Sequence, residues 1–275
     1  MLKQRFLVVL VLLPIGIVAI VLGGLYFSLL MSIFIGLAAW EYSKLFKKGD
    51  FEPCVFMVVS GSLLLIILQT LYGFEYHLPA LAFLILVSMF RHMISYEKGR
   101  DKAATDFAIT ISGIFYIGFL GSHFVGMRAL DNGVWWILIV LPAIWLADMG
   151  GYFIGKAIGK HKLSPRLSPK KTWEGYVGGI VFALVGTPLL ALLYKQLGLA
   201  APEFITFGHL MVIAILMSVI PTLGDLGESM IKRQVGEKDS SSLLPGHGGI
   251  FDRIDSWLWG VVIGYYLINL IFLNI

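Results

Sequence analysis

The strongest constraint on the fold is a series of long apolar runs that fills most of the 275-residue chain. A helix needs about 20 mainly apolar residues to cross the hydrocarbon core of a bilayer, within a range of about 17–25. Nine runs meet this requirement, and they are residues 6–22, 25–43, 54–72, 78–96, 105–127, 134–155, 174–196, 205–224 and 257–273. Only 14% of the residues are charged, whereas a typical soluble domain has about a quarter. The lipid bilayer is therefore the expected solvent for most of this chain.

Helices are the expected secondary structure of these runs. In lipid, every backbone polar group needs a partner within the protein, so only helices and closed barrels span a membrane. The runs lack the period-two alternation that a barrel requires. The sequence therefore predicts an all-α, polytopic integral membrane protein with about nine transmembrane helices in a single membrane domain, 1–275. We expect the first run to be a retained helix and not a cleaved signal peptide.

The distribution of lysine and arginine predicts the orientation. If the N-terminus lies in the cytoplasm, 19 of the 21 Lys and Arg residues fall on the cytoplasmic side, and only Arg128 and Lys195 fall on the other. Positive residues concentrate in cytoplasmic loops, so the split predicts an N-in, C-out topology. The two longest basic connections, 156–173 and 225–256, then both face the cytoplasm.

Charged residues of both signs gather between the last two apolar runs. They are Asp225, Glu228, Asp239, Asp252 and Asp255, together with Lys232, Arg233, Lys238 and Arg253. Asp225 and Glu228 are three residues apart, as are Asp252 and Asp255, and this spacing places two side chains on one helix face. Magnesium prefers carboxylate oxygens and keeps waters and phosphates as its other ligands. The sequence therefore predicts that the two acidic pairs converge on one cation, next to bases that bind phosphate.

Backbone rich in serine and glycine separates the two acidic pairs. It includes residues 240–242, which are all serine, and residues 246–249, which read Gly-His-Gly-Gly. Glycine lets the backbone approach a ligand closely, and N–H groups exposed in such turns cradle phosphate oxygens. The same stretch also fits an ordinary loop, and His247 is open as a ligand, a phosphate donor or a spacer.

Several of these residues also have structural interpretations. Lysine and arginine near a membrane often anchor helix ends. This structural role explains the presence of Lys232 and Arg233, and so does phosphate binding. Acidic residues at membrane depth are costly and usually functional, which favours functional roles for Asp225 and Asp252. Glu228 is open as a metal ligand or as an ion-pair partner.

A second polar segment covers residues 145–175. Asp148 interrupts an apolar run and is open as a hydrogen-bond acceptor for substrate or as half of a buried ion pair. Lys170 and Lys171 precede Thr172, which we expect to cap a helix that begins at Trp173. A helix N-terminus next to lysines is a ready anion site. Basic residues in this loop also fit a simple anchor to acidic lipid headgroups.

Three segments together resemble a known family. Residues 229–255 read Ser-x-Ile-Lys-Arg-x4-Lys-Asp-x-Ser-x2-Leu-Pro-x-His-Gly-Gly-Ile-x-Asp-Arg-Ile-Asp, without a departure from the signature of the phosphatidate cytidylyltransferases, also called CDP-diacylglycerol synthases. The segment 168–175, Ser-Pro-Lys-Lys-Thr-x-Glu-Gly, resembles a second family segment, as does Asp148-x3-Tyr152-x2-Gly155. Gly151 stands where another small residue such as alanine is expected. The resemblance is strong over about 145–260, and the first 140 residues match only as hydrophobic spans.

The resemblance implies a Mg²⁺-dependent enzyme of phospholipid biosynthesis that makes CDP-diacylglycerol and pyrophosphate from CTP and phosphatidate. It implies mainly scaffold spans in 1–140 and the catalytic portion in 141–260. It further implies a homodimer. The expected location is a bacterial inner membrane, with an organellar membrane open as the alternative, and the Lys and Arg distribution predicts an active site that faces the cytoplasm. Membrane lipid is an expected partner, and nucleic acid is not.

The residue types suit this chemistry, because the reaction brings two polyanions together. We assign Asp225 and Asp252 to Mg²⁺. The expected substrate-binding residues are Asp148, Lys170, Lys171, Thr172, Ser229, Gly248 and Gly249. The expected catalytic residues are Lys232, Arg233, Lys238, Asp239, His247, Arg253 and Asp255. The alternatives are a CTP-dependent lipid-alcohol kinase, which releases CDP, and an ion transporter whose path is lined by Asp148 and Asp225.

Overall fold

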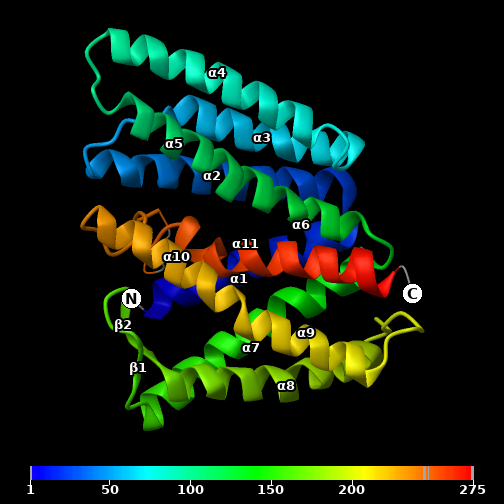
Figure 1. Ribbon diagram of the computed structural model, residues 1–275. Coiled ribbons are helices and arrows are strands. Elements are labelled where there is room, and N and C mark those ends of the chain that lie inside the picture. Colours follow the sequence, from blue (N-terminus) through cyan, green and yellow to red (C-terminus); the bar gives the residue numbers. More distant parts are fainter. Residues whose placement is uncertain (1, 244–245, 247, 274–275) are drawn as a thin grey trace. The chain divides into compact units, whose positions relative to one another are not determined.

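The computed structural model describes residues 2–243, 246 and 248–273, with side chains from Leu10 onward. Its elements in chain order are α1 (Leu2–Leu22), α2 (Gly24–Lys48), α3 (Val55–Tyr72), α4 (His77–Glu97), α5 (Ala103–Gly113), the π-helical turn η1 (Ile114–Phe119), α6 (Leu120–Ala129), α7 (Gly133–Ile158), β1 (Lys162–Ser164), β2 (Ser168–Thr172), α8 (Trp173–Gln196), α9 (Phe207–Val219), α10 (Pro221–Gln234), α11 (Phe251–Tyr266) and the π-helical turn η2 (Leu267–Phe272). Helices dominate the structure (Figure 1).

The predicted all-α membrane architecture is confirmed. Within the described residues, eight helical stretches are long and apolar enough to cross a membrane, and they correspond to the second to ninth predicted runs. The first predicted run lies in α1, whose described apolar part, Leu10–Leu22, is shorter than the others. The count of nine spans and the N-in, C-out orientation therefore stay predictions.

A proline separates the eighth apolar helix from the charged helix that follows it. Helix α9 ends at Val219, and α10 begins at Pro221. Proline lacks a backbone N–H and suits the first position of a helix, where that group has no helical partner. The helical path then continues to Gln234, ten residues beyond the predicted end of the run at residue 224. Asp225 and Lys232 consequently lie on a regular helix and not in a loop.

The chain forms two compact units. The first contains residues 1–129 and 231–254, and the second contains residues 130–230 and 255–275. Helices α10 and α11 each contribute residues to both units.

In the first unit, α2 packs against α3, and α4 packs against α5 (Figure 1). Leu65, Leu81, Leu84 and Ile114 form a buried apolar cluster that joins α3, α4 and η1. Some of the polar groups between these helices have partners within the protein, as lipid favours. For example, the Tyr42 hydroxyl donates to the carbonyl of Ile109 at 3.2 Å.

In the second unit, α7 and α8 approach each other closely along facing glycines. A Cβ atom at Gly175 would lie 2.7 Å from the carbonyl oxygen of Gly151, and a Cβ at Gly179 would lie 2.5 Å from that of Ala147. Small residues let membrane helices pack backbone to backbone, where van der Waals contact replaces the missing hydrophobic driving force. Asp148 lies within α7 and Thr172 is the N-cap of α8, so this packing helps to place the polar segment 145–175.

The connection between α7 and α8 is a short β-hairpin and not an irregular loop. Strands β1 and β2 pair antiparallel, with Lys162 opposite Thr172 and Ser164 opposite Ser168. A bulge lies between Lys162 and Ser164. Strand β2 carries Lys170 and Lys171 directly into the N-terminus of α8. The sequence did not predict this hairpin, because each strand is short and Pro169 lies inside the second.

We predict that Gly179→Ala destabilises the protein. The new methyl group would meet backbone atoms of α7, which cannot move aside independently, and overpacking of this kind costs about 1–3 kcal/mol. The midpoint of thermal unfolding in detergent should therefore fall by several degrees. Gly16→Ala is the matched control, because a Cβ at this helical glycine has nothing within 4 Å. Equal midpoints for the two variants would contradict the proposed backbone contact.

Candidate functional site

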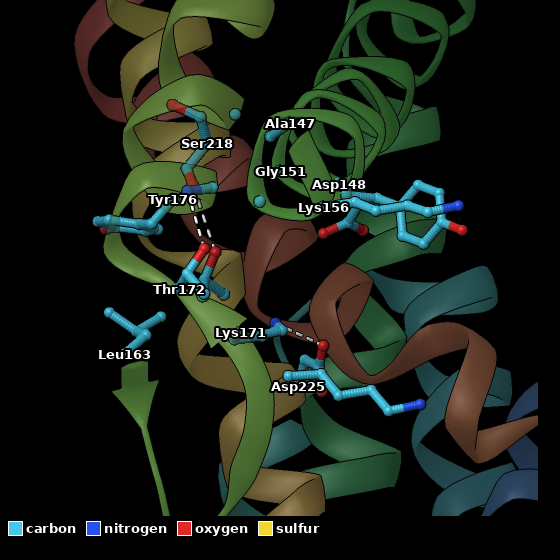
Figure 2. A pocket seen from close by; sticks show the side chains of 16 residues that line it. Ala147, Asp148, Gly151, Lys156, Leu163, Lys171, Thr172, Tyr176, Ser218 and Asp225 are labelled. Carbon is cyan, nitrogen blue, oxygen red and sulfur yellow. Dashed lines mark hydrogen bonds and ion pairs between the residues drawn. The ribbon is translucent and has the colours of Figure 1, made fainter. Parts of the chain in front are cut away.

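The second unit contains a cavity of about 580 Å³ (Figure 2). Its deeper wall is formed by small residues of α7 and α8, including Ala147, Gly151 and Gly179. Its polar lining includes the predicted site residues Asp148, Lys170, Lys171, Thr172 and Asp225, and also Tyr152, Lys156, Ser218 and Thr222. Segments more than 60 residues apart in the sequence, 148–156 and 218–225, thus contribute to one cavity.

Thr172 caps α8, as the sequence predicts. Its side-chain oxygen accepts the backbone N–H of Gly175 at 3.1 Å. The Glu174 carboxylate, in the first turn of α8, accepts the backbone N–H groups of Lys160 and His161 at 3.1–3.3 Å. Glu174 Oε1 also contacts His161 Nδ1 at 2.6 Å. These contacts fasten both ends of the hairpin to the start of α8 and so fix the strand that carries Lys170 and Lys171.

Lys171 and Asp225 form an ion pair at the edge of the cavity. Lys171 Nζ lies 2.6 Å from Asp225 Oδ2 (Figure 2), and the side chains are 26% and 33% exposed. The Ser229 hydroxyl donates to the other carboxylate oxygen, Oδ1, over a long 3.4 Å. Asp225 is therefore a partly exposed carboxylate with a strong partner on Oδ2 and a long, weak hydrogen bond to Oδ1.

Helix α7 contributes three polar residues to the cavity. Asp148, Tyr152 and Lys156 are four residues apart, so they follow one face of the helix. Lys156 Nζ lies over the Tyr152 ring, 5.8 Å from its centre. Asp148 is exposed in the structure. The cavity is therefore bordered by two lysines of β2 and by a third lysine from α7.

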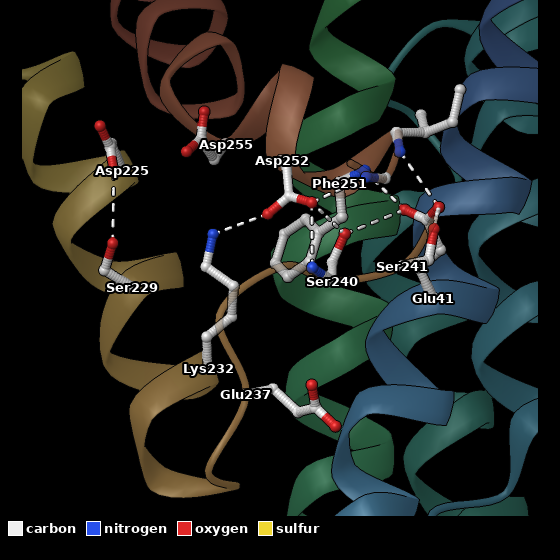
Figure 3. Close-up of polar contacts among 12 residues, drawn as sticks. Glu41, Asp225, Ser229, Lys232, Glu237, Ser240, Ser241, Phe251, Asp252 and Asp255 are labelled. Atoms are coloured by element: carbon white, nitrogen blue, oxygen red, sulfur yellow. Dashed lines mark hydrogen bonds and ion pairs between the residues drawn. The ribbon is translucent and has the colours of Figure 1, made fainter. Parts of the chain in front are cut away.

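Asp252 accepts four hydrogen bonds within the first unit (Figure 3). Its Oδ1 accepts from Lys232 Nζ at 2.6 Å. Its Oδ2 accepts from the backbone N–H and the hydroxyl of Ser240, at 2.9 and 2.8 Å, and from the N–H of Gly249 at 2.8 Å. The Asp252 side chain is only 5% exposed. This carboxylate therefore organises the serine- and glycine-rich loop in addition to pairing with a lysine.

Two glycines make room for this carboxylate network. Gly248 has a φ of +81°, and a Cβ there would lie 2.7 Å from Asp252 Oδ2. A Cβ at Gly249 would lie 2.6 Å from Glu41 Oε2 and would also collide with the Ser240 hydroxyl. Both glycines therefore allow a carboxylate side chain of the protein to approach the backbone closely.

Glu41 belongs to this network but is not among the predicted site residues. It lies on α2, is fully buried, and accepts the N–H of Phe251 at 2.7 Å and that of Ile250 at 3.1 Å. The Ser241 hydroxyl donates to Glu41 Oε1 at 2.6 Å. A signal was present in the sequence, because Glu41 is a carboxylate inside the apolar run 25–43, and such residues are usually functional.

The other predicted residues lie at varied positions. Exposed side chains are those of Arg233, Lys238, Asp239 and Arg253. Arg233 Nη1 donates to the carbonyl of Glu237 at 2.9 Å. Asp255 is buried on α11 and accepts the N–H of Ser256 at 2.6 Å. His247 lies outside the described residues.

The structure thus brings the predicted residues together in two groups. Asp148, Lys170, Lys171, Thr172 and Asp225 share the cavity of the second unit. Lys232, Gly249 and Asp252 share the network of the first unit. A joint metal site of Asp225 and Asp252 draws on both units, so it stays a prediction.

Comparison with known proteins identifies the family of this chain. The profile of the cytidylyltransferase family matches residues 3–271. A phosphatidate cytidylyltransferase of Pseudomonas aeruginosa is 37% identical over 279 residues, which cover 93% of this chain and 93% of that protein. One of Brucella suis is 34% identical over 91% of this chain and 86% of its own length, and one of Bacillus subtilis is 45% identical over 59% of this chain and 58% of its own length. The chain therefore belongs to the cytidylyltransferase family and is a nucleotidyltransferase.

Proposed function

We propose that this enzyme transfers CMP from CTP to phosphatidate, giving CDP-diacylglycerol and pyrophosphate for phospholipid synthesis. The observation that carries the proposal is the similarity over almost the whole chain to relatives named phosphatidate cytidylyltransferase. The cavity lined by Lys156, Lys170, Lys171 and Asp225 supports it, because both substrates are polyanions. The apolar helices around the cavity suit a substrate whose acyl chains stay in lipid.

The reaction is an in-line displacement at phosphorus. A phosphate oxygen of phosphatidate attacks the α-phosphorus of CTP and forms a new P–O bond. The bond from the α-phosphorus to the bridging oxygen breaks, and pyrophosphate leaves with the electron pair. The attacking oxygen is already anionic at neutral pH, so no strong general base is needed. Catalysis then depends on positioning and on stabilisation of negative charge.

Residues of the second unit are suited to holding phosphate. Lys170 and Lys171 stand on a strand that is fixed at both ends, and they precede the N-terminus of α8. The positive end of a helix favours anions. We propose that these lysines bind substrate phosphate, with Thr172 holding the helix start in place. Asp148 is proposed to accept a hydrogen bond from substrate.

Residues of the first unit complete the proposal. Lys232 is held by Asp252 in a nearly buried ion pair, which presents its ammonium group in one orientation. We propose that Lys232, Arg233, Lys238 and Arg253 contact phosphate groups. Asp239, His247 and Asp255 are proposed to orient these groups or to contact the nucleotide, and Ser229, Gly248 and Gly249 to contact substrate.

Magnesium is proposed as the metal cofactor, with Asp225 and Asp252 as ligands. Asp225 suits this role, because its Oδ1 is weakly bonded and the side chain is a third exposed. Asp252 suits it less readily, because Oδ1 is shared with Lys232 and Oδ2 accepts three hydrogen bonds. Within the described residues, no three His, Cys, Asp or Glu side chains group to hold a metal. Mg²⁺ takes most of its ligands from water and phosphate and would neutralise phosphate charge.

We propose the side of the membrane on which the active site lies from the distribution of Lys and Arg. The surplus of Lys and Arg in 156–173 and 225–256 supports a cytoplasmic active site, where CTP is present. Bacterial relatives support the bacterial inner membrane as the location. We also propose that the enzyme is a homodimer.

The reaction is tested by incubating the purified full-length protein with CTP labelled at the α-phosphate, phosphatidate and Mg²⁺. We expect labelled CDP-lipid and one pyrophosphate per turnover. Replacing Mg²⁺ with a chelator should abolish turnover. Release of CDP with a lipid alcohol as the acceptor would instead identify a kinase, and ion flux in liposomes without turnover would identify a transporter.

Asp225→Ala should abolish turnover while the protein remains folded in the membrane. Metal stabilisation of phosphate charge is worth several kcal/mol, and about 1.4 kcal/mol is a factor of ten in rate, so we expect a loss on the order of 100-fold or more. Glu203→Gln, an exposed carboxylate outside the cavity, is the control and should keep the wild-type rate. Near-normal Mg²⁺-dependent activity of Asp225→Ala would remove this residue from the metal site.

Lys171→Met should reduce kcat/KM by roughly tenfold or more, because a hydrogen bond to a charged group is worth about 1.5–3 kcal/mol. The variant keeps the length of the side chain and removes its charge. Initial rates at limiting CTP and limiting phosphatidate show which substrate depends on it. Lys195→Met, at the other end of α8, is the control. An unchanged rate at limiting concentrations of both substrates would contradict a phosphate role.

A further inference from the structure

The N-terminus of α11 is held by a carboxylate that comes from the opposite end of the sequence. Glu41 Oε2 accepts the N–H of Phe251, and Oε1 accepts the N–H of Ile250, at 2.7 and 3.1 Å. The first N–H groups of a helix have no partner within the helix, and a carboxylate there also favours the helix dipole. Glu41 therefore caps α11 from α2, across 209 and 210 sequence positions.

Glu41 also holds the loop that leads to α11. The Ser241 hydroxyl donates to Glu41 Oε1 at 2.6 Å and accepts the N–H of Leu243 at 3.0 Å. The Ser240 hydroxyl lies 3.4 Å from Glu41 Oε2 but only 2.8 Å from Asp252 Oδ2, so its single proton favours Asp252. Glu41 and Asp252 thus both accept hydrogen bonds from the same loop (Figure 3).

This arrangement connects Glu41 to Lys232 through Asp252. Asp252 is the second residue of α11, so the position of the helix start sets the position of its carboxylate. Asp252 Oδ1 in turn accepts from Lys232 Nζ at 2.6 Å, and these side chains are 5% and 10% exposed. A shift of the helix start would move the carboxylate that orients the lysine.

We propose that Glu41 is a positioning residue of the nucleotidyl-transfer site, acting on Lys232 and Asp252 without touching substrate. The proposal rests on the proposed function for its kinetic part. Its structural part, that Glu41 orders the described residues 240–243 and 248–251, stands independently of which reaction the enzyme performs.

Glu41→Gln distinguishes the role of the carboxylate hydrogen bonds from the role of the side-chain volume. The variant keeps the size of the side chain, but its amide NH₂ must face either the N–H of Ile250 or that of Phe251. A backbone N–H cannot become an acceptor, so one buried bond at the start of α11 is lost. Ser43→Ala is the matched control, because it removes a fully buried hydrogen bond on the same helix, from the Ser43 hydroxyl to the carbonyl of Ala39.

The first measurement is hydrogen exchange of the full-length protein in detergent. Glu41→Gln should speed amide exchange in peptides covering 240–251, and Ser43→Ala should not. If Glu41→Gln fails to fold, Ser241→Ala, which removes the hydroxyl that donates to Glu41 and accepts from Leu243, should produce a smaller change in peptides that cover 248–251 and exclude Leu243. Unchanged exchange in 240–251 for the folded variant would overturn the proposal, whether or not the enzyme turns over CTP.

The second measurement is kinetic, and wild-type turnover of CTP and phosphatidate is established first. Loss of a residue that orients a site commonly costs about 10- to 100-fold in activity. We expect this loss for Glu41→Gln, mainly in kcat, with partial recovery in Glu41→Asp.

A double-mutant cycle then tests the route of the effect. If Glu41 acts through the Lys232–Asp252 pair, the loss in Glu41→Gln combined with Lys232→Met should be clearly smaller than the product of the two single losses. Losses that multiply would show that Glu41 supports only general stability and would overturn its positioning role. Absence of turnover in the wild type would refute the proposed function and leave the exchange experiment to decide the structural part.

Discussion

The satisfaction of buried carboxylates is the constraint on which the polar part of this structure depends. Apolar helices offer no partners for a charge, so each buried acid needs donors from a specific segment. Glu41 and Asp252 are satisfied by N–H groups and hydroxyls of residues 240–251. These bonds hold the described parts of that segment, residues 240–243 and 248–251. Gly249 is needed in the same place, because a Cβ there would occupy the space of the Glu41 carboxylate.

The sequence predicted the features that depend on residues close together in the chain. Hydrophobic length located the helices that cross the membrane, and Thr172 was recognised as a cap because capping depends on residues only three positions apart. It did not predict the role of Glu41 or the β-hairpin at 162–172. The Glu41 partners lie about 200 positions away, and the hairpin is stabilised by Glu174 through contacts with residues 160 and 161. Such pairings are decided by tertiary packing, which propensity and periodicity do not contain.

The glycines of α7 and α8 serve both packing and the cavity. Gly175 and Gly179 permit the helices to approach until backbone meets backbone, and Gly151, Gly175 and Gly179 also line the cavity. A larger residue at these positions would separate the helices and fill the cavity at once. The small size of these residues therefore allows both the close approach of the helices and the open cavity. This explains why a rigid scaffold and an open pocket occur in the same pair of helices.

The two lysine–aspartate pairs have a consequence for the proposed chemistry. Lys171 and Lys232 each lie 2.6 Å from a carboxylate oxygen, so both lysines are already ordered and partly desolvated. Fixing a flexible lysine on binding costs up to about 2 kcal/mol of side-chain entropy, and an ordered lysine has lost most of it beforehand. A phosphate that approaches such a pair gains a preoriented ammonium group but also meets the negative aspartate. A divalent cation at that aspartate would reduce the repulsion, so each ion pair by itself is compatible with the proposed magnesium ion.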